Sequence, residues 1–206
     1  MNKTQAIRFV VKPLVFLACL VPTAIIAART FGLWGDLGAN PIEEVLDHFG
    51  NWGLRFILIT LAITPFRKLT GWNTLVRFRR MIGLFAFYYA FMHFTTWLVL
   101  DRNLHVPDIL EDVVERPFIA IGFVAVVLLS ALAITSFAAL RRRMGRNWQK
   151  LHNAVYLIAV LAIWHYWWQV KNDITEPLIY AGILAVLLGA RVYGRRGKQR
   201  QRVFSA

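Results

Sequence analysis

The sequence predicts an all-α integral membrane protein, a bundle of six transmembrane helices with both termini in the cytoplasm. The 206 residues are 58% hydrophobic and include 8 Trp and 15 Phe, which is too apolar for an ordinary soluble domain of this length. Apolar runs long enough to cross about 30 Å of hydrocarbon recur along the chain. The charged residues divide between alternate connections. We therefore treat residues 1–206 as one transmembrane domain.

The predicted spans follow one another along the chain. The first contains Pro13 and Pro22 and lacks the small-residue cleavage pattern of a secretory signal, so we expect a retained helix. Arg55 and Thr60 interrupt the second, and only the polar link KNDITE separates the fifth from the sixth. The six spans cover residues 10–28, 49–66, 81–100, 117–139, 152–169 and 176–193.

The connections between these spans alternate in charge. Nineteen of the 24 Lys and Arg, and none of the 11 Asp and Glu, lie in segments 1–12, 66–80, 141–150 and 191–206. The positive-inside rule places these basic segments in the cytoplasm and the acidic connections outside, which agrees with an even number of crossings. The net charge of +13 therefore indicates orientation and contact with anionic lipid, not nucleic-acid binding.

Cysteine use narrows the choice of metal sites. Cys19 is the one cysteine, so the chain has no intrachain disulfide and no Cys cluster for zinc or iron–sulfur. Iron bound through histidine remains open.

Three of the five histidines fall inside predicted spans, where an ionisable group is costly and usually faces a partner, a cavity or a cofactor. These are His93, His152 and His165, whereas His48 and His105 lie where water solvates them. A packed, hydrogen-bonded imidazole is the alternative for each buried histidine taken alone. Whether their depths match decides between the two interpretations.

The fixed rise of an α-helix gives these depths. His93 lies about 20 Å beyond the cytoplasmic entry of the third span, and His165 about 22 Å beyond that of the fifth. The two histidines therefore share a level in the outer half of the membrane, on helices that run in the same direction. We expect them to bind one metal between them.

The pair His93 and His165 predicts a binding site for heme b. Two neutral imidazoles suit the axial positions of a heme iron, and the chain supplies an apolar sleeve. Zinc or copper would need further ligands at this depth, where Met92 is the one soft donor nearby. Arg55, about 9 Å inside the outer surface by helical rise, is either a snorkelling guanidinium or a counter-charge to a heme propionate.

His152 does not share this outer site. It lies about 3 Å inside the cytoplasmic surface, and the matching position on the third span falls at Arg79 or Arg80. His152 and His165 also stand about 140° apart around a straight helix, so they face one seam only with a local distortion. His152 is a single-sided heme ligand, a hydrogen-bond donor to another cofactor, or an interfacial histidine.

Paired histidines on the third and fifth of six helices resemble the ferric-reductase-type transmembrane domain of NADPH oxidases and metalloreductases. Over nearly the whole chain, a closer resemblance is to the MsrQ (YedZ) family, heme-binding membrane subunits of bacterial periplasmic methionine-sulfoxide reductase systems. Three stretches match that family in order and spacing: GNWGLRFILITLAITPFR, RFRRMIGLFAFYYAFMH and NWQKLHNAVYLIAVLAIWHYWW.

The resemblance implies a role in the bacterial inner membrane. Electrons would pass from the quinone pool or a cytoplasmic flavin reductase, through heme b, to a periplasmic molybdopterin (MsrP-like) reductase that repairs oxidised methionine. The chain would transfer electrons without acting on methionine sulfoxide itself. His93, His152 and His165 match the family's heme histidines. FMN is associated with the family, and the basic segments RKLTGWNTLVRFRR and RRRMGRNWQK are candidates for holding a flavin phosphate.

About 15 residues follow the last predicted span, so we expect no appended FAD and NADPH domain and an external electron donor. The acidic outer loops are a candidate docking surface for the partner, with plain solvation as the alternative. Two other functions remain open. One is a standalone ferric or quinone reductase of the same fold. The other is a non-redox transporter or assembly factor whose histidines relay protons or pack.

Overall fold

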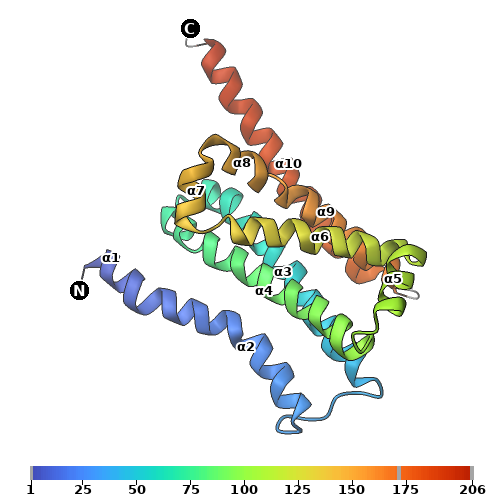
Figure 1. The fold of residues 1–206 in the computed structure, drawn as a ribbon. Helices are drawn as coiled ribbons and strands as arrows, with labels where there is room; N and C mark the ends of the chain where they lie inside the picture. The colour runs from blue at the N-terminus through green and yellow to red at the C-terminus, as the bar shows by residue number, and fades with distance from the viewer. Residues whose placement is uncertain (1, 171–172, 205–206) are drawn as a thin grey trace.

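The computed structural model describes residues 2–170 and 173–204, with side chains described up to Tyr193 except that of Lys3. All regular structure in these ranges is helical, which confirms the all-α prediction for the described residues (Figure 1). Short π-helical turns adjoin α2 and α4, and a 3-10 turn precedes α4. The α-helices are α1 (Lys3–Ala6), α2 (Lys12–Thr30), α3 (Pro41–Thr70), α4 (Arg79–Thr96), α5 (Val106–Glu115), α6 (Pro117–Ile134), α7 (Ala138–Met144), α8 (Arg146–His152), α9 (Val155–Gln169) and α10 (Thr175–Phe204).

Several helices have the length and composition of membrane spans, so the chain is a multi-pass membrane protein. Within the described residues there are five, namely Thr4–Thr30, Pro41–Thr70, Arg79–Asp101, Pro117–Ile134 and Thr175–Tyr193. The fifth predicted span corresponds to α9, which has only 15 residues. An α-helix needs roughly 20 residues to cross the hydrocarbon core. Crossing by α9 therefore stays a prediction.

The second predicted span, 49–66, lies within a longer helix, because α3 begins at Pro41 and ends at Thr70. The Asn40 side chain accepts a hydrogen bond from the Glu43 N–H at the N-cap, and Pro41 suits the first helical position. Gly71 ends the helix in the left-handed conformation, at φ 73°. These caps extend the helix beyond its apolar run, which was the feature used for prediction.

The fourth predicted span, 117–139, extends past its helix, because α6 ends at Ile134. The Thr135 hydroxyl donates to the Ala131 carbonyl at 2.7 Å, and the Ser136 hydroxyl donates to the Leu132 carbonyl at 2.8 Å. Such local side-chain bonds compete with continued helical bonding. Phe137 is extended, and α7 follows in a new direction.

The fifth predicted span, 152–169, is divided between two helices. The Asn153 N–H is shared between the carbonyls of Gln149, at 3.1 Å, and Lys150, at 3.3 Å, which tightens the last turn of α8. His152 ends α8, whereas His165 lies in α9. The chain thus has a local distortion between the two histidines.

Tyr89 of α4 ties α2 to the centre of the bundle. Its fully buried hydroxyl donates to the Cys19 carbonyl at 2.7 Å and accepts from the Thr23 N–H at 3.2 Å. These groups lie one helical turn apart beside Pro22, so the hydroxyl satisfies backbone atoms where the helix is disturbed. The Tyr89 ring also stacks on Phe56 of α3 at 5.1 Å.

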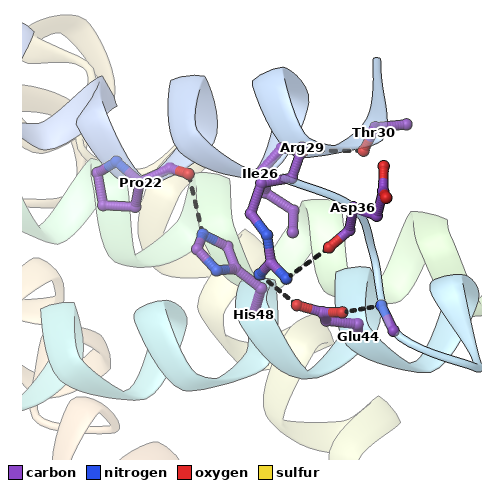
Figure 2. Close-up of polar contacts among 8 residues, drawn as sticks. Pro22, Ile26, Arg29, Thr30, Asp36, Glu44 and His48 are labelled. Atoms are coloured by element: carbon purple, nitrogen blue, oxygen red, sulfur yellow. Dashed lines mark hydrogen bonds and ion pairs between the residues drawn. The ribbon is translucent and has the colours of Figure 1, made fainter. Parts of the chain in front are cut away.

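Figure 2 shows a polar cluster that fixes the connection from α2 to α3. Arg29 forms an ion pair with Glu44 and donates to the Asp36 carbonyl, while Glu44 accepts from the Gly38 N–H at 2.7 Å. His48 was expected in water. It is instead partly buried, and its Nε2 bonds the Pro22 carbonyl at 2.9 Å because α2 covers this part of α3.

The central helices are α3, α4, α6 and α9, with α10 packed against α3 and α9 and extending beyond them (Figure 1). Helix α5 lies at one end of the bundle, and α7 and α8 lie at the other. We name these the acidic end, with the connections 31–40 and 102–116, and the basic end, with the connections 71–78 and 135–154. Large apolar side chains of α2, α6 and α10 are exposed on the sides, as expected for contact with lipid.

Candidate functional site

His93 and His165 meet inside the bundle, toward the acidic end. Their ring centroids are 6.0 Å apart and the ring planes are nearly perpendicular, at 83°. The structure thus brings together the two histidines that helical rise placed at one level, and their binding of one metal stays a prediction. Both rings line one cavity of about 420 Å³ between α3, α4, α6 and α9. Much of its wall is apolar, formed among others by Leu54, Ile57, Ile119, Phe123, Ala125 and Ala162.

A backbone carbonyl holds each of these imidazoles. The Nδ1 of His93 lies 2.8 Å from the Leu46 carbonyl oxygen, and the Nδ1 of His165 lies 2.7 Å from that of Phe118. A carbonyl only accepts, so each Nδ1 carries the proton and donates. The Nε2 of each ring is then the unprotonated nitrogen, the form that binds a metal.

A glycine lies beside each ring, one helical turn after the carbonyl residue. A Cβ at Gly50 would stand 2.9 Å from the Nδ1 of His93, and a Cβ at Gly122 would stand 2.8 Å from the Nδ1 of His165. These separations are too short for real Cβ contacts. Only glycine therefore allows the imidazole to reach the carbonyl of the facing helix.

The two histidine sites repeat one local structure. Each histidine follows its carbonyl residue by 47 positions, and each glycine lies four positions after that residue. The pair α3–α4 thus corresponds to the pair formed by α6 and α9. Sequence reasoning missed this repeat because flanking side chains differ, as in LDHFG and FIAIG. The equal spacing from glycine to histidine was the available signal.

The residues at this site fit a heme. Two metal–imidazole bonds of about 2 Å each, with ring centres about 1 Å beyond the nitrogens, place the centroids about 6 Å apart, close to the observed separation. Within the described part of the chain, no group of three or more His, Cys, Asp and Glu could hold a bare metal ion. A porphyrin supplies the other iron ligands itself, so two histidines suffice.

Arg55 does not line this cavity. Its Nε donates to the Tyr180 hydroxyl at 2.9 Å, and its guanidinium lies 5.0 Å from the centroid of the Trp52 ring. The charge is thus held between α3 and α10 by a hydrogen bond and a cation–π contact. A role as propionate partner stays a prediction that these contacts do not favour.

Arg102 and Arg116 are the arginines that line the cavity, at its acidic end. Both form ion pairs with Asp112, which is only 5% exposed. Sequence reasoning missed them because it treated 101–116 as a solvated loop. Helix α5 instead lies at this end of the bundle, and its Asp112 carboxylate is buried between the two guanidinium groups.

His152 lies outside this cavity, at the basic end. Its Nε2 is 3.2 Å from the Thr135 hydroxyl oxygen, and its ring stacks on Trp148 with centroids 4.0 Å apart. Trp148 in turn donates its Nε1–H to the Thr135 carbonyl at 2.9 Å. These contacts join α8 to the end of α6, so the structure does not bring His152 together with the other two histidines.

Comparison with known proteins agrees with this geometry. Residues 49–163, from α3 into α9, match the family model described as ferric reductase like transmembrane component. The heme-binding subunit MsrQ of protein-methionine-sulfoxide reductase from Xanthomonas euvesicatoria is 47% identical over 204 residues, 97% of this chain and 94% of the relative. The chain belongs to the MsrQ family. The MsrQ of Bordetella pertussis is 50% identical over 197 residues, which cover 92% of this chain and 94% of the relative.

Membership in the MsrQ family bears out the family resemblance of the three quoted stretches. The matched segment contains both glycines and two of the three histidines, and it ends two residues before His165. The paired site therefore combines the matched segment with the next turn of α9.

Proposed function

We propose that this MsrQ family member is the heme b membrane subunit of a periplasmic methionine-sulfoxide reductase system and carries electrons across the bacterial inner membrane. The observation that carries the proposal is the pair His93 and His165, held by two carbonyls with both free nitrogens available to one cavity. The relatives' name, heme-binding subunit MsrQ, supports heme as the occupant.

Heme bound in this cavity supplies one-electron redox chemistry. His93 and His165 would bind its iron through Nε2, and the carbonyls of Leu46 and Phe118 fix the proton on Nδ1 and orient both rings. The apolar wall excludes water, which limits side reactions. Arg102 and Arg116, which line the acidic end of the cavity and share Asp112, would be the arginines to hold the carboxylates of a heme.

In this proposal the basic end is cytoplasmic, both termini lie there, and α9 completes six crossings. Electrons enter at the basic end from the quinone pool or a flavin reductase, with FMN or quinone as a further cofactor near His152. They leave at the acidic end to the molybdopterin reductase. The chain moves electrons and performs no chemistry on methionine sulfoxide. The alternating charge of the connections supports this orientation.

An absorption spectrum of the purified full chain tests the heme. We expect a strong Soret band and split visible bands that sharpen when dithionite reduces the iron. A colourless preparation that is fully folded by circular dichroism would contradict the proposal.

Reconstitution tests the direction of electron flow. The chain would be inserted into proteoliposomes. The electron donor, either a flavin reductase with NADH or a reduced quinone, would be supplied at the basic end. The periplasmic reductase and methionine sulfoxide would be added at the acidic end, outside the vesicles. We expect sulfoxide reduction with the wild type and none with His165→Ala. Equal rates with both proteins would show that electrons reach the partner by another route.

A further inference from the structure

A second cavity, of about 150 Å³, lies at the basic end. It is formed where the end of α3 meets the start of α4, the α8–α9 region and α10. Each residue that lines it carries a hydrogen-bond donor, and no described lining residue carries a carboxylate. These residues are Thr64, Lys68, Arg79, Gln149, Asn153, Tyr156 and Arg191.

Arg191 is held rigidly in the wall of this cavity. Pro65 has no N–H to donate to the Leu61 carbonyl one turn earlier, and Arg191 donates its Nη2 to that carbonyl instead. Its Nη1 donates to the Tyr156 hydroxyl. Pro65, which leaves the Leu61 carbonyl without its helical donor, therefore provides an acceptor that holds the guanidinium in place.

Two hydrogen-bond donors of the Arg191–Tyr156 pair have no acceptor among the described residues. The Nε of Arg191 is buried and has no hydrogen-bond partner among the described residues. The Tyr156 hydroxyl accepts from Arg191, so its own O–H is free to donate. A buried unpaired donor is uncommon in a native protein.

The described residues that line this cavity include no acid to neutralise it. Segments 66–80, 141–150 and 191–206 contain no Asp or Glu. Across the described side chains, Lys68, Arg79 and Arg191 form no ion pair. Three like charges around one small space are unfavourable unless an anion joins them. The counter-charge must therefore come from outside the chain.

We propose that this cavity binds a single phosphate group, supplied by a lipid headgroup or by a soluble phosphate compound. Pockets that enclose a drug-sized ligand have volumes of roughly 300 Å³ or more, and this cavity is well below that size. It is small enough to suit a single tetrahedral oxyanion. Arginine forks and a lysine approaching from different helices match the several oxygens of phosphate. The proposal goes beyond electron transfer and does not depend on the heme.

Thermal unfolding of the full chain in uncharged detergent tests the site, with inorganic phosphate as the probe at constant ionic strength. We expect Tm to rise and saturate in the wild type. Lys68→Gln and Arg79→Gln should each raise the half-saturating phosphate concentration about tenfold, because each removes one charge-assisted contact. Arg146→Gln is the matched control, since this exposed α8 cation lies outside the cavity, and it should titrate like the wild type.

Nanodiscs separate the two sources of phosphate. The discs would contain phosphatidylcholine and phosphatidylglycerol. If lipid headgroups occupy the site, free phosphate does not raise Tm in these discs. Native mass spectrometry then finds lipid retained by the wild type and lost from Lys68→Gln. If a soluble compound is the ligand, phosphate raises Tm in the discs as in detergent. The proposal is overturned if phosphate affects the wild type, Lys68→Gln and Arg146→Gln equally, or if no saturable rise or retained lipid is seen. The Soret band of the same samples reports the heme separately, so failure of either proposal is distinguishable.

Discussion

His165 and His152 lie 13 positions apart in one apolar stretch, yet their imidazoles are used in opposite ways. In His165 the Nδ1 is bonded to a backbone carbonyl and Nε2 is left for the cavity. In His152 the Nε2 is itself bonded to the Thr135 hydroxyl and Trp148 covers the ring. A histidine able to bind a metal is therefore identified by a hydrogen bond at Nδ1 that leaves Nε2 free, and not by its spacing in the sequence.

The residues around His165 also differ from those around His152. At the acidic end a second histidine on α4 faces His165, and a glycine on each partner helix leaves room for the rings. At the basic end the corresponding stretch of α4 begins with Arg79, which lines the phosphate-sized cavity. The surroundings of His165 thus bring two imidazoles together, whereas those of His152 gather positive charge.

Removing the ligands should give the largest contrast. Loss of a residue that only supports a metal ligand already lowers metal affinity about 10-fold. We therefore expect His93→Ala and His165→Ala, which remove the ligands themselves, each to lower heme per protein by about tenfold or more. His152→Ala should keep the outer heme. Pyridine hemochromogen assays on purified protein measure this. Loss of all heme from His152→Ala alone would reverse the comparison.

Filling the space beside the rings should give the next largest effect. Gly50→Ala and Gly122→Ala bring a Cβ within 3 Å of an Nδ1 and break its bond to the carbonyl. Heme affinity should fall about 10- to 100-fold, the range for lost outer-shell partners. Heme titration of the apoprotein measures it. Gly189→Ala is the matched control, because its Cβ meets nothing within 4 Å and alanine favours the helix by up to about 1 kcal/mol.

At the inner histidine we expect a smaller effect on stability. Thr135→Val removes the hydroxyl that bonds His152, at a cost of about 1 kcal/mol in the free energy of unfolding. Thr135→Ser keeps the hydroxyl and should lose less. Denaturant unfolding followed by tryptophan fluorescence reports the change, and the heme spectrum should be unaltered. A lowered heme content in Thr135→Val would mean that His152 binds heme.

Charge at the mouth of the cavity should give the smallest effect. Arg116→Gln removes a cation that lines the cavity, which disfavours the reduced, more negative heme and lowers its midpoint potential. The shift should stay below about 60 mV, the one-electron equivalent of a tenfold change. Arg55→Gln, outside the lining, should shift it less. A larger shift with Arg55→Gln in a redox titration would restore Arg55 as the propionate partner.

Residues whose position depends on fixed helical rise were predictable. The match between His93 and His165 follows from counting residues along two helices. Rise gives depth but not direction around the helix, so it could not show that Arg55 points to Tyr180 and Trp52 instead of the cavity.

Features made by tertiary contacts were not predictable in this way. The end of α8 at His152 carries no Pro or Gly signal, so hydropathy joined it to α9. Gly50 and Gly122 act through a missing side chain, which is visible only when the facing histidine is in place. Arg102 and Arg116 reach the site because α5 lies at the acidic end of the bundle, which loop charges alone do not reveal.

Electron paramagnetic resonance of the ferric protein tests the central claim most directly, in the wild type and in His152→Ala. Two imidazoles bound to one iron make it low-spin, and ring planes near 83° should give the strongly anisotropic low-spin signal of perpendicular axial ligands. We expect that signal in both proteins, lost in His93→Ala. A high-spin signal as the main species in His152→Ala would contradict the assignment of His93 and His165 as a joint pair.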